Sequence, residues 1–346
     1  HGLTTKIGED RQMHAVVLVG GFGTRLRPLT LATPKPLLPI GNLPLLERLM
    51  TSLAKGGVTN AVLSLGFKPE PFLEAFPKNI CAGVKLTYAV EDRPLDTAGA
   101  IGFAAREAGI HTRGETFLVA NGDVLTDLDI SELVEFHRSA GAQGTIHLTP
   151  VEDPSQYGVV ETQADGRVLR FVEKPLPGQS NSRNVNAGTY VFEASVLDRM
   201  PGVAPLSIER ATFPEMVVDK QLFGFATDDY WIDAGRPDTY VRANLDLSQR
   251  KHGYSVVAVS TKAEIAKSAT ISQSMIADDC KVGENAQVVR SVLLNGARVE
   301  ANAVVIDSAV MGHIGSFAEV TSCLVGIDGD VRSGAVLRDA KVPDPN

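Results

Sequence analysis

Apolar positions in the first part of the chain follow two alternating patterns. Short apolar runs predict buried strands, and longer stretches with apolar residues three and four apart predict helices. The predicted strands cover residues 15–19, 61–65, 84–90 and 116–120, and the predicted helices cover residues 43–55, 69–76 and 237–250. This alternation predicts an α/β fold with a mixed, mostly parallel sheet, and ligands of such sheets bind at the carboxyl ends of the strands.

The pattern changes after about residue 255, where five pentapeptides share one form. They are IAKSA, VGENA, VEANA, IGSFA and VRSGA, and their starts step by 17, 17, 15 and 17 residues. Apolar residues recur every five to six positions, which is typical of hexapeptide-type coils whose short strands each bury one side chain. Residues 254–346 are therefore predicted to form a left-handed parallel β-helix of about five coils that must stack.

Composition narrows the possible partners and locations. Acidic residues outnumber basic ones, 41 to 33, and no basic block occurs, which argues against a nucleic-acid partner. The three cysteines lie far apart without a C-x-x-C pair, as expected of a reduced, cytoplasmic protein. The chain contains no apolar run of membrane-spanning length. Residues 1–12 precede Met13 and have no apolar signal region, so they are expected to be a leader or a disordered tail.

The first predicted strand leads directly into a glycine-rich loop with two cations. Gly20, Gly21 and Gly23 are followed by Thr24 and Arg25. Glycines let backbone N–H groups approach an anion closely, and an Arg adds a fixed positive charge. Farther along, Lys35 lies between two prolines that restrict its backbone.

This combination predicts a polyphosphate site. The alternative is a tight turn with surface cations. The loop is neither a Walker A loop, since no Gly-Lys-Ser/Thr follows, nor a dinucleotide fingerprint, since Leu26 takes the place of the third glycine.

Two aspartates follow apolar strands far apart in the sequence. Asp123 ends the Asn-Gly-Asp sequence after the strand at 116–120, and Asp233 lies in YWIDAG. Mg²⁺ prefers one or two carboxylates together with phosphate oxygens and water. The pair therefore predicts a Mg²⁺ site beside the phosphates, although an Asp in a plain turn is the alternative for Asp123 alone.

A second group of residues suits a sugar phosphate. Gly158 in DPSQYGVV would let the backbone approach a sugar, and Glu173 and Lys174 end the strand-like segment VLRFVEKP. Successive strand residues point to opposite faces, so we expect one of these two side chains to accept sugar hydroxyls and the other to hold a phosphate. A solvated strand end is the alternative interpretation.

Several of these motifs resemble those of the sugar-phosphate nucleotidylyltransferases, or NDP-sugar pyrophosphorylases. They are GGFGTRLRPLT, PKPLLP, PSQYGVV, RFVEKP, VNAGTYVF, SIER and YWIDAGRPDTY. Within that family the similarity is greatest to the mannose-1-phosphate guanylyltransferases, and it covers residues 14–250. The resemblance implies a Rossmann-like nucleotidyltransferase domain, here residues 13–253, that is followed by the β-helix and that assembles as a homo-oligomer.

The resemblance also implies a reaction and further roles. GTP and mannose 1-phosphate would give GDP-mannose and pyrophosphate. Arg25, Lys35, Asp123 and Asp233 would be catalytic, with Mg²⁺ on the aspartates, and Asn186 would contact the sugar. The loop PLDTAGA would approach the nucleotide base through Gly99, although Asp96 replaces the family's usual glycine there.

Three alternatives stay open at this point. Glucose 1-phosphate or a heptose 1-phosphate, with UTP, TTP, ATP or GTP, could be the substrates. A catalytically inactive homologue that senses a nucleotide sugar is an alternative from another class, and Asp96 is the feature in its favour. An acyltransferase on the β-helix is the third, and only His313 supports it.

Overall fold

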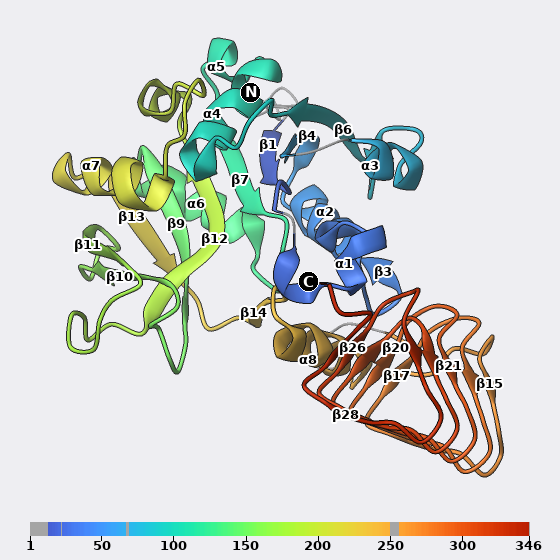
Figure 1. Ribbon diagram of the computed structural model, residues 1–346. Helices are drawn as coiled ribbons and strands as arrows, with labels where there is room; N and C mark the ends of the chain where they lie inside the picture. Colours follow the sequence, from blue (N-terminus) through green and yellow to red (C-terminus); the bar gives the residue numbers. More distant parts are fainter. Residues whose placement is uncertain (1–12, 22, 67–68, 250–255, 346) are drawn as a thin grey trace, which may run out of the picture. The chain divides into compact units, whose positions relative to one another are not determined.

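The computed structural model describes residues 13–21, 23–66, 69–249 and 256–345, which form two compact units (Figure 1). Unit 1 contains the chain up to Gly20, Met50–Asn121 and Leu128–Asp229. Unit 2 contains Gly21–Leu49, Gly122–Asp127 and the chain from Tyr230 onwards. The expected leader at residues 1–12 and the expected domain boundary at 253/254 lie outside the described residues, so both stay predictions.

Four parallel strands form the centre of the sheet in unit 1. They lie in the order β7 (Phe117–Asn121), β1 (Met13–Leu18), β4 (Val58–Leu65) and β6 (Val84–Val90). Figure 1 shows these strands next to one another. All four correspond to strands that the sequence predicts: β1, β4 and β7 are buried at most positions, whereas buried and exposed positions largely alternate in the more peripheral β6.

Antiparallel strands extend this sheet beyond β7. The pairs β12–β7, β12–β9, β12–β10 and β10–β11 are antiparallel, whereas β9 pairs with β13 in parallel. These strands are β9 (Gly144–Pro150), β10 (Gly158–Thr162), β11 (Val168–Glu173), β12 (Asn184–Phe192) and β13 (Leu222–Ala226). The two-residue strand β5 (Ile80–Cys81) pairs with β6 at the other edge. The predicted mixed α/β sheet is confirmed, but its strand pairs are four parallel and five antiparallel among the described residues, so the sheet is parallel mainly at its centre.

Helices pack their apolar faces on this sheet. In α4 (Asp96–Glu107) the small residues Ala98, Ala104 and Ala105 are fully buried and belong to one core with Val16 and Val62 of the sheet. The other helices of unit 1 are α3 (Glu70–Ala75), α5 (Ile110–Arg113), α6 (Ile130–Ala140), α7 (Phe213–Val218), the 3₁₀ helix η3 (Ala194–Arg199) and the π-helical turn η4 (Ile208–Thr212). Helix α2 (Leu45–Lys55) belongs to unit 2 up to Leu49 and to unit 1 from Met50.

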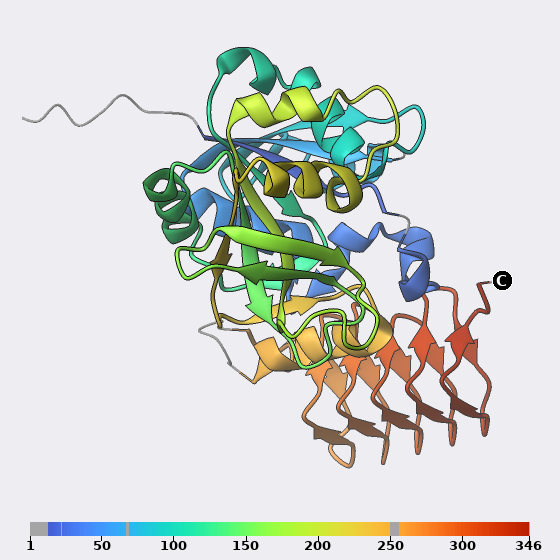
Figure 2. The same ribbon diagram turned by 90° about the vertical axis from the view of Figure 1, so that its left-hand side faces the viewer.

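The C-terminal repeat forms the predicted β-helix in unit 2. Three sheets of five parallel strands make up its faces, and Figure 2 shows the coils stacked in a row. The first face contains β15 (Glu264–Ile265), β18 (Lys281–Val282), β21 (Arg298–Val299), β24 (His313–Ile314) and β27 (Asp330–Val331). The second contains β16 (Thr270–Ser272), β19 (Gln287–Val289), β22 (Val304–Ile306), β25 (Glu319–Thr321) and β28 (Val336–Arg338). The third contains β17 (Met275–Ile276), β20 (Val292–Leu293), β23 (Ala309–Val310), β26 (Leu324–Val325) and β29 (Lys341–Val342).

A ladder of buried hydroxyls lines one corner of these coils. Ser274 Oγ accepts the backbone N–H of Ser291 at 3.0 Å, Ser291 Oγ accepts that of Ser308 at 3.1 Å, and Ser308 Oγ accepts that of Cys323 at 2.9 Å. The three serines are at most 5% exposed. Because a buried N–H without an acceptor costs stability, this ladder explains why small polar residues recur inside an apolar repeat.

The remaining elements of unit 2 share a core with the outer face of the β-helix. Leu26, Leu29 and Tyr240 belong to the same buried cluster as Val292 and Leu324. These elements are η1 (Thr24–Leu26), α1 (Leu29–Ala32), η2 (Lys35–Leu37), β2 (Pro39–Ile40), β3 (Leu43–Pro44), β8 (Val124–Thr126), β14 (Trp231–Asp233) and α8 (Pro237–Ser248). The loop from Gly21 onwards and the repeat therefore belong to one unit, although more than 200 residues separate them in the sequence.

In the part of the chain that the structure describes, no helix has the length and apolar character that crossing a membrane requires. The cytoplasmic location and the homo-oligomer stay predictions.

Candidate functional site

Unit 2 brings the predicted lysine and both predicted aspartates together. Lys35 Nζ lies 2.7 Å from Asp123 Oδ2 and 3.7 Å from Asp233 Oδ1. The aspartates are neighbours because β8 and β14 pair antiparallel, with Asp233 opposite Val124. The backbone N–H of Ala234 donates to the carbonyl of Asp123 at 3.2 Å and closes the end of this pair. Two carboxylates and one ammonium thus share a single centre.

The backbone around Lys35 holds its side chain inside this centre. The residue begins η2, in which the N–H of Leu38 donates to the Lys35 carbonyl at 3.1 Å. Lys35 is only 8% exposed, and Pro36 next to it is also buried. A buried ammonium requires charged partners, and the two carboxylates supply them.

Gly235 makes room for the charged groups of this centre. A Cβ at this position would lie 2.7 Å from Lys35 Nζ, 2.7 Å from Asp233 Oδ1 and 3.0 Å from a terminal nitrogen of Arg25. Its N–H also donates to Asp233 Oδ1 at 2.8 Å. Two cationic groups therefore meet beside a carboxylate above a glycine, and cationic groups gathered in this way can bind a further anion. Gly235 was not among the predicted site residues, although its place two residues after Asp233 in the Asp-Ala-Gly sequence could have indicated it.

The donor set of this centre fits a Mg²⁺ ion. Among the described residues, no group of three or more His, Cys, Asp and Glu side chains forms a metal site by itself. Mg²⁺ needs only one or two carboxylates when phosphate oxygens and water complete its shell. The side chains of Asp123 and Asp233 are 39% and 23% exposed, so both carboxylates can reach a ligand in addition to Lys35.

The glycine loop approaches this centre at Gly23. Its φ of 58° lies in the left-handed region, and it precedes η1, which contains Thr24 and Arg25. A Cβ on Gly23 would lie 3.0 Å from Thr30 Cγ2 and 3.1 Å from Lys35 Cβ, and the Thr30 hydroxyl donates to the Gly23 carbonyl at 2.8 Å. A side chain at Gly23 would therefore push Lys35 away, in addition to straining the backbone.

The other two glycines of the loop differ in their surroundings. A Cβ on Gly20 would lie 2.9 Å from the backbone nitrogen of Gly66 within unit 1, so packing explains this glycine. Gly21 is exposed and has no atom within 4 Å of its would-be Cβ. Among the described residues, no neighbour therefore requires a glycine there, and its role toward a nucleotide stays a prediction.

Unit 1 contains a second carboxylate pair, Glu173 and Glu209. Glu209 Oε2 accepts hydrogen bonds from the hydroxyls of Thr97 and Ser207, each at 2.8 Å. The pKa of Glu173 is raised, first by burial and then by the nearby Glu209 carboxylate, whereas the charges of Lys174 and Arg210 act in the opposite direction. Hydroxyl groups, rather than a cation, are thus the direct partners of Glu209.

Lys174 does not continue the strand that contains Glu173. Strand β11 ends at Glu173, and Lys174 has a φ of 48°. The expectation that the two side chains point to opposite faces is wrong, because this left-handed residue breaks the alternation and brings Lys174 Nζ to 3.9 Å from Glu173 Oε1. The Lys174 side chain is 61% exposed, so its ammonium is accessible to a ligand.

Gly158 and Asn186 are held by contacts of unit 1. Gly158 pairs with Glu173 across β10 and β11, and a Cβ on it would lie 3.0 Å from Glu173 Oε2 and would overlap the Phe171 ring. Asn186 Nδ2 donates to the Tyr190 hydroxyl at 3.0 Å, and its Oδ1 accepts the N–H of Gly188 at 3.0 Å. Gly158 therefore leaves space beside Glu173, and the Asn186 amide has a fixed orientation.

The segment that contains Gly99 has a structural reason for its glycine. Its N–H donates to the Leu206 carbonyl at 3.1 Å, and a Cβ would lie 2.7 Å from the Ala204 carbonyl oxygen. Asp96 has a φ of 56°, and its carboxylate accepts the N–H of Thr97 at 2.8 Å. Asp96 thus adopts the backbone conformation that a glycine would favour, whereas the contact of Gly99 with a base stays a prediction.

Seven of the predicted site residues therefore gather in two groups, one in each unit, whereas the contacts of Gly20, Gly99 and Asn186 are with other residues. Unit 2 brings together Arg25, Lys35, Asp123 and Asp233, and unit 1 brings together Gly158, Glu173 and Lys174. Glu209 was not among the predicted site residues, although it lies in the SIER motif, because its spatial relation to Glu173 is not evident from the sequence.

The chain is similar to known nucleotidyl transferases. The nucleotidyl transferase family matches residues 14–250. Mannose-1-phosphate guanyltransferase of Schizosaccharomyces pombe is 42% identical over 274 residues, which are 78% of this chain and 74% of that protein. Mannose-1-phosphate guanylyltransferase of Mycobacterium tuberculosis is 42% identical over 238 residues, which are 68% of this chain and 65% of that protein.

A solved structure is also similar. A Bacillus anthracis protein assigned to the glucose-1-phosphate thymidylyltransferases, crystallised with sucrose, is 26% identical with a TM-score of 0.58. The match covers 67% of this chain and 94% of that chain.

Proposed function

This chain belongs to the nucleotidyl transferase family, and from that premise we propose that it transfers the guanylyl group of GTP to mannose 1-phosphate. The products are GDP-mannose and pyrophosphate. The observation that carries the proposal is the meeting of Arg25, Lys35 and the two aspartates at Gly235. The choice of GTP and mannose 1-phosphate is supported by the names of relatives that are 42% identical.

The reaction needs no nucleophile from the protein. An oxygen of the sugar phosphate attacks the α-phosphorus of GTP, and the bond from that phosphorus to the bridging oxygen of the β-phosphate breaks. Pyrophosphate leaves in line with its electron pair. Positioning and neutralisation of charge account for most of the catalysis of such transfers.

The residues of unit 2 are suited to the triphosphate. Arg25 and the N–H groups of the loop, which contains Gly20, Gly21, Gly23 and Thr24, would hold the departing β- and γ-phosphates. Lys35 is buried between carboxylates, which fixes its ammonium, and it would neutralise the charge that grows near the α-phosphate. When a phosphate arrives, this ammonium can exchange part of its contact with Asp123 for the new anion.

Asp123 and Asp233 would hold Mg²⁺. The ion would supply neutralisation of phosphate charge and polarisation of the α-phosphate when bound.

The residues of unit 1 are suited to the sugar phosphate. Lys174 has an accessible ammonium, which is appropriate for a phosphate monoester. Glu173 and Asn186 would contact sugar hydroxyls, and Gly158 would let the backbone approach the ring. Because the pKa of Glu173 is raised, its carboxyl group takes up a proton at a higher pH than usual as the pH falls. The protonated group can donate a hydrogen bond as well as accept one.

A glucose-1-phosphate nucleotidylyltransferase is the second candidate. The solved structure from Bacillus anthracis supports it, but with 26% identity that support is weaker than the 42% identity to the mannose-specific relatives. An inactive sensor is disfavoured, because Arg25, Lys35, Asp123 and Asp233 are all present and gathered.

A substrate grid tests the proposal. The purified chain is assayed for pyrophosphate release with GTP, ATP, UTP and TTP against mannose, glucose and heptose 1-phosphates. We expect the highest kcat/KM for GTP with mannose 1-phosphate, at least about tenfold above other pairs, which a difference of about 1.4 kcal/mol in binding produces. Preference for glucose 1-phosphate with TTP, or no turnover with any pair, contradicts the proposal.

A further inference from the structure

On the third face of the β-helix, one residue that points away from the β-helix core is charged, whereas the others in its row are apolar. Register places Met275, Val292, Ala309, Leu324 and Lys341 in one row across β17, β20, β23, β26 and β29. The first four are buried in the core that the β-helix shares with the rest of unit 2. Their chain neighbours point inward to the separate core of the β-helix. Only the fifth position of the row contains a charged residue.

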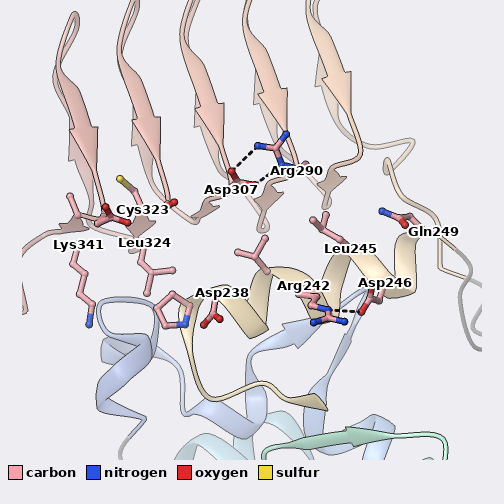
Figure 3. A pocket seen from close by; sticks show the side chains of 15 residues that line it. Asp238, Arg242, Leu245, Asp246, Gln249, Arg290, Asp307, Cys323, Leu324 and Lys341 are labelled. Carbon is pink, nitrogen blue, oxygen red and sulfur yellow. Dashed lines mark hydrogen bonds and ion pairs between the residues drawn. The ribbon is translucent and has the colours of Figure 1, made fainter. Parts of the chain in front are cut away.

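Lys341 forms a hydrogen bond with the segment that contains Arg25. Its Nζ donates to the backbone carbonyl of Arg25 at 3.1 Å. Figure 3 shows the Lys341 side chain extending from the last strand, beside Leu324 of the preceding coil. The apolar row and its terminal lysine therefore form one continuous contact from the repeat to the segment that contains Arg25.

A second contact fixes the same segment from the preceding coil. Gly326 is buried, and a Cβ on it would lie 2.9 Å from Cβ, 3.1 Å from Cγ and 3.2 Å from the carbonyl oxygen of Pro28. Leu26 and Leu29 belong to the same core as Leu324. The backbone from residue 25 to residue 29 thus rests on the last two coils of the repeat.

The position of this backbone determines where the Arg25 guanidinium lies in the charged centre. The guanidinium of Arg25 and the ammonium of Lys35 both lie around the would-be Cβ of Gly235, at 3.0 Å and 2.7 Å. Asp233 Oδ1 lies 2.7 Å from the same point, so the guanidinium shares this space with an ammonium and a carboxylate, and a shift of its backbone would change its interaction with both. A backbone that is fixed from outside keeps the arginine in place before the anion arrives, which lowers the cost of ordering it on binding.

We infer that Lys341 is a positioning residue for nucleotide binding: the last coil of the β-helix fixes the Arg25 backbone so that its guanidinium is ready for the phosphates of GTP. The inference rests on the proposed function for the identity of the nucleotide. The competing interpretation is that Lys341 only attaches the last coil, in which case its loss would change stability without any selective change in nucleotide binding.

Three variants separate these interpretations. Lys341→Met keeps the aliphatic stem and removes the donor, and Lys341→Arg keeps a cationic donor. Lys281→Met is the matched control, because Lys281 in β18 pairs with Glu264 at 3.1 Å on another face of the β-helix. GTP affinity is measured calorimetrically with Mg²⁺ present, and KM is measured for each substrate.

We expect Lys341→Met to weaken GTP binding by about three- to twentyfold, which is less than the roughly 12- to 160-fold value of one hydrogen bond with a charged group, because the lost bond acts on GTP only through the Arg25 backbone. KM for mannose 1-phosphate should change by less than about twofold, and the melting temperature should stay within about 2 °C of that of Lys281→Met. Lys341→Arg should recover at least half of the lost affinity on a logarithmic scale.

The outcomes for the inference and for the proposed function are distinct. Unchanged GTP affinity in Lys341→Met, or an equal loss in Lys281→Met, overturns the inference. A wild-type chain that binds no GTP overturns it as well. A wild-type chain that binds GTP but makes no GDP-mannose contradicts the proposed function alone, and the binding data still decide the role of Lys341.

Discussion

The two units each contain a pair of carboxylates, and the two pairs have opposite partners. In unit 2 a buried ammonium, Lys35, lies within 4 Å of both Asp123 and Asp233. In unit 1 hydroxyl groups donate to Glu209, and the pKa of Glu173 is raised by burial and by Glu209. The same functional group is therefore prepared for cations and phosphates in one unit and for hydroxyl-rich ligands in the other.

Removal of one charge from the pair in unit 2 should have the largest effect. Asp123→Asn or Asp233→Asn should each lower kcat by about 10²–10⁴-fold, because a lost metal ligand costs several kcal/mol of transition-state stabilisation. Asp238→Asn is the control, since that carboxylate in unit 2 is 70% exposed and pairs only with Arg236 among the described residues. Steady-state kinetics with Mg²⁺ in excess measures the effect. Near-normal turnover in either variant would contradict the assignment of that aspartate as a Mg²⁺ ligand.

Gly235→Ala should have a smaller effect on catalysis and little effect on stability. The added methyl group would displace the ends of Lys35, Arg25 and Asp233, which are flexible, so the fold can adapt. We expect kcat/KM for GTP to fall by about 10–100-fold, because positions wrong by about 1 Å are costly in catalysis. The melting temperature should change by less than about 3 °C. A large loss of stability with normal kinetics would assign Gly235 to packing.

Glu209→Gln tests the pair in unit 1. The neutral amide removes the repulsion that raises the pKa of Glu173, so that pKa should move down toward its ordinary value, which carboxyl NMR can measure. We expect KM for mannose 1-phosphate to rise by about three- to tenfold, with KM for GTP nearly unchanged. Glu215→Gln on α7 is the control, since that side chain is 60% exposed. An equal change in both KM values would contradict a role specific to the sugar.

The smallest effect is a pH dependence of stability that arises in unit 1. Burial lowers the pKa of His147 to about 4, its Nδ1 has no hydrogen-bond partner among the described residues, and the residue is 0% exposed. The unfolded chain binds a proton near pH 6.5, whereas the folded chain does so only near pH 4. The free energy of unfolding should therefore fall as the pH drops through this window, by at most about 3 kcal/mol.

His147→Leu removes this titration, so its unfolding free energy should depend less steeply on pH between about 6.5 and 4. Chemical denaturation at several pH values measures the slope. Identical slopes in the wild-type chain and the variant would exclude His147 as the cause.

Local patterns predicted much of the fold and the charged residues of the site. Strand β6 has the predicted bounds, and the spacing of the pentapeptides predicted the stacked coils. Contacts across long stretches of sequence could not be predicted in this way. Nothing local indicates that Glu209 lies near Glu173, or that Lys341 reaches the carbonyl of Arg25. The prediction for the orientation of Lys174 was wrong for a local reason. Its backbone is left-handed, which a strand-like sequence does not indicate.

The division between the two carboxylate centres is tested most directly by two-substrate kinetics on Arg25→Ala and Lys174→Ala. Arg25→Ala should raise KM for GTP and leave KM for mannose 1-phosphate nearly unchanged. Lys174→Ala should raise KM for mannose 1-phosphate by about 10–1,000-fold, the loss of one charge-assisted contact or somewhat more, with a much smaller change for GTP. The reverse pattern, in which Lys174→Ala weakens GTP and spares mannose 1-phosphate, would contradict the assignment of the two substrates to the two centres.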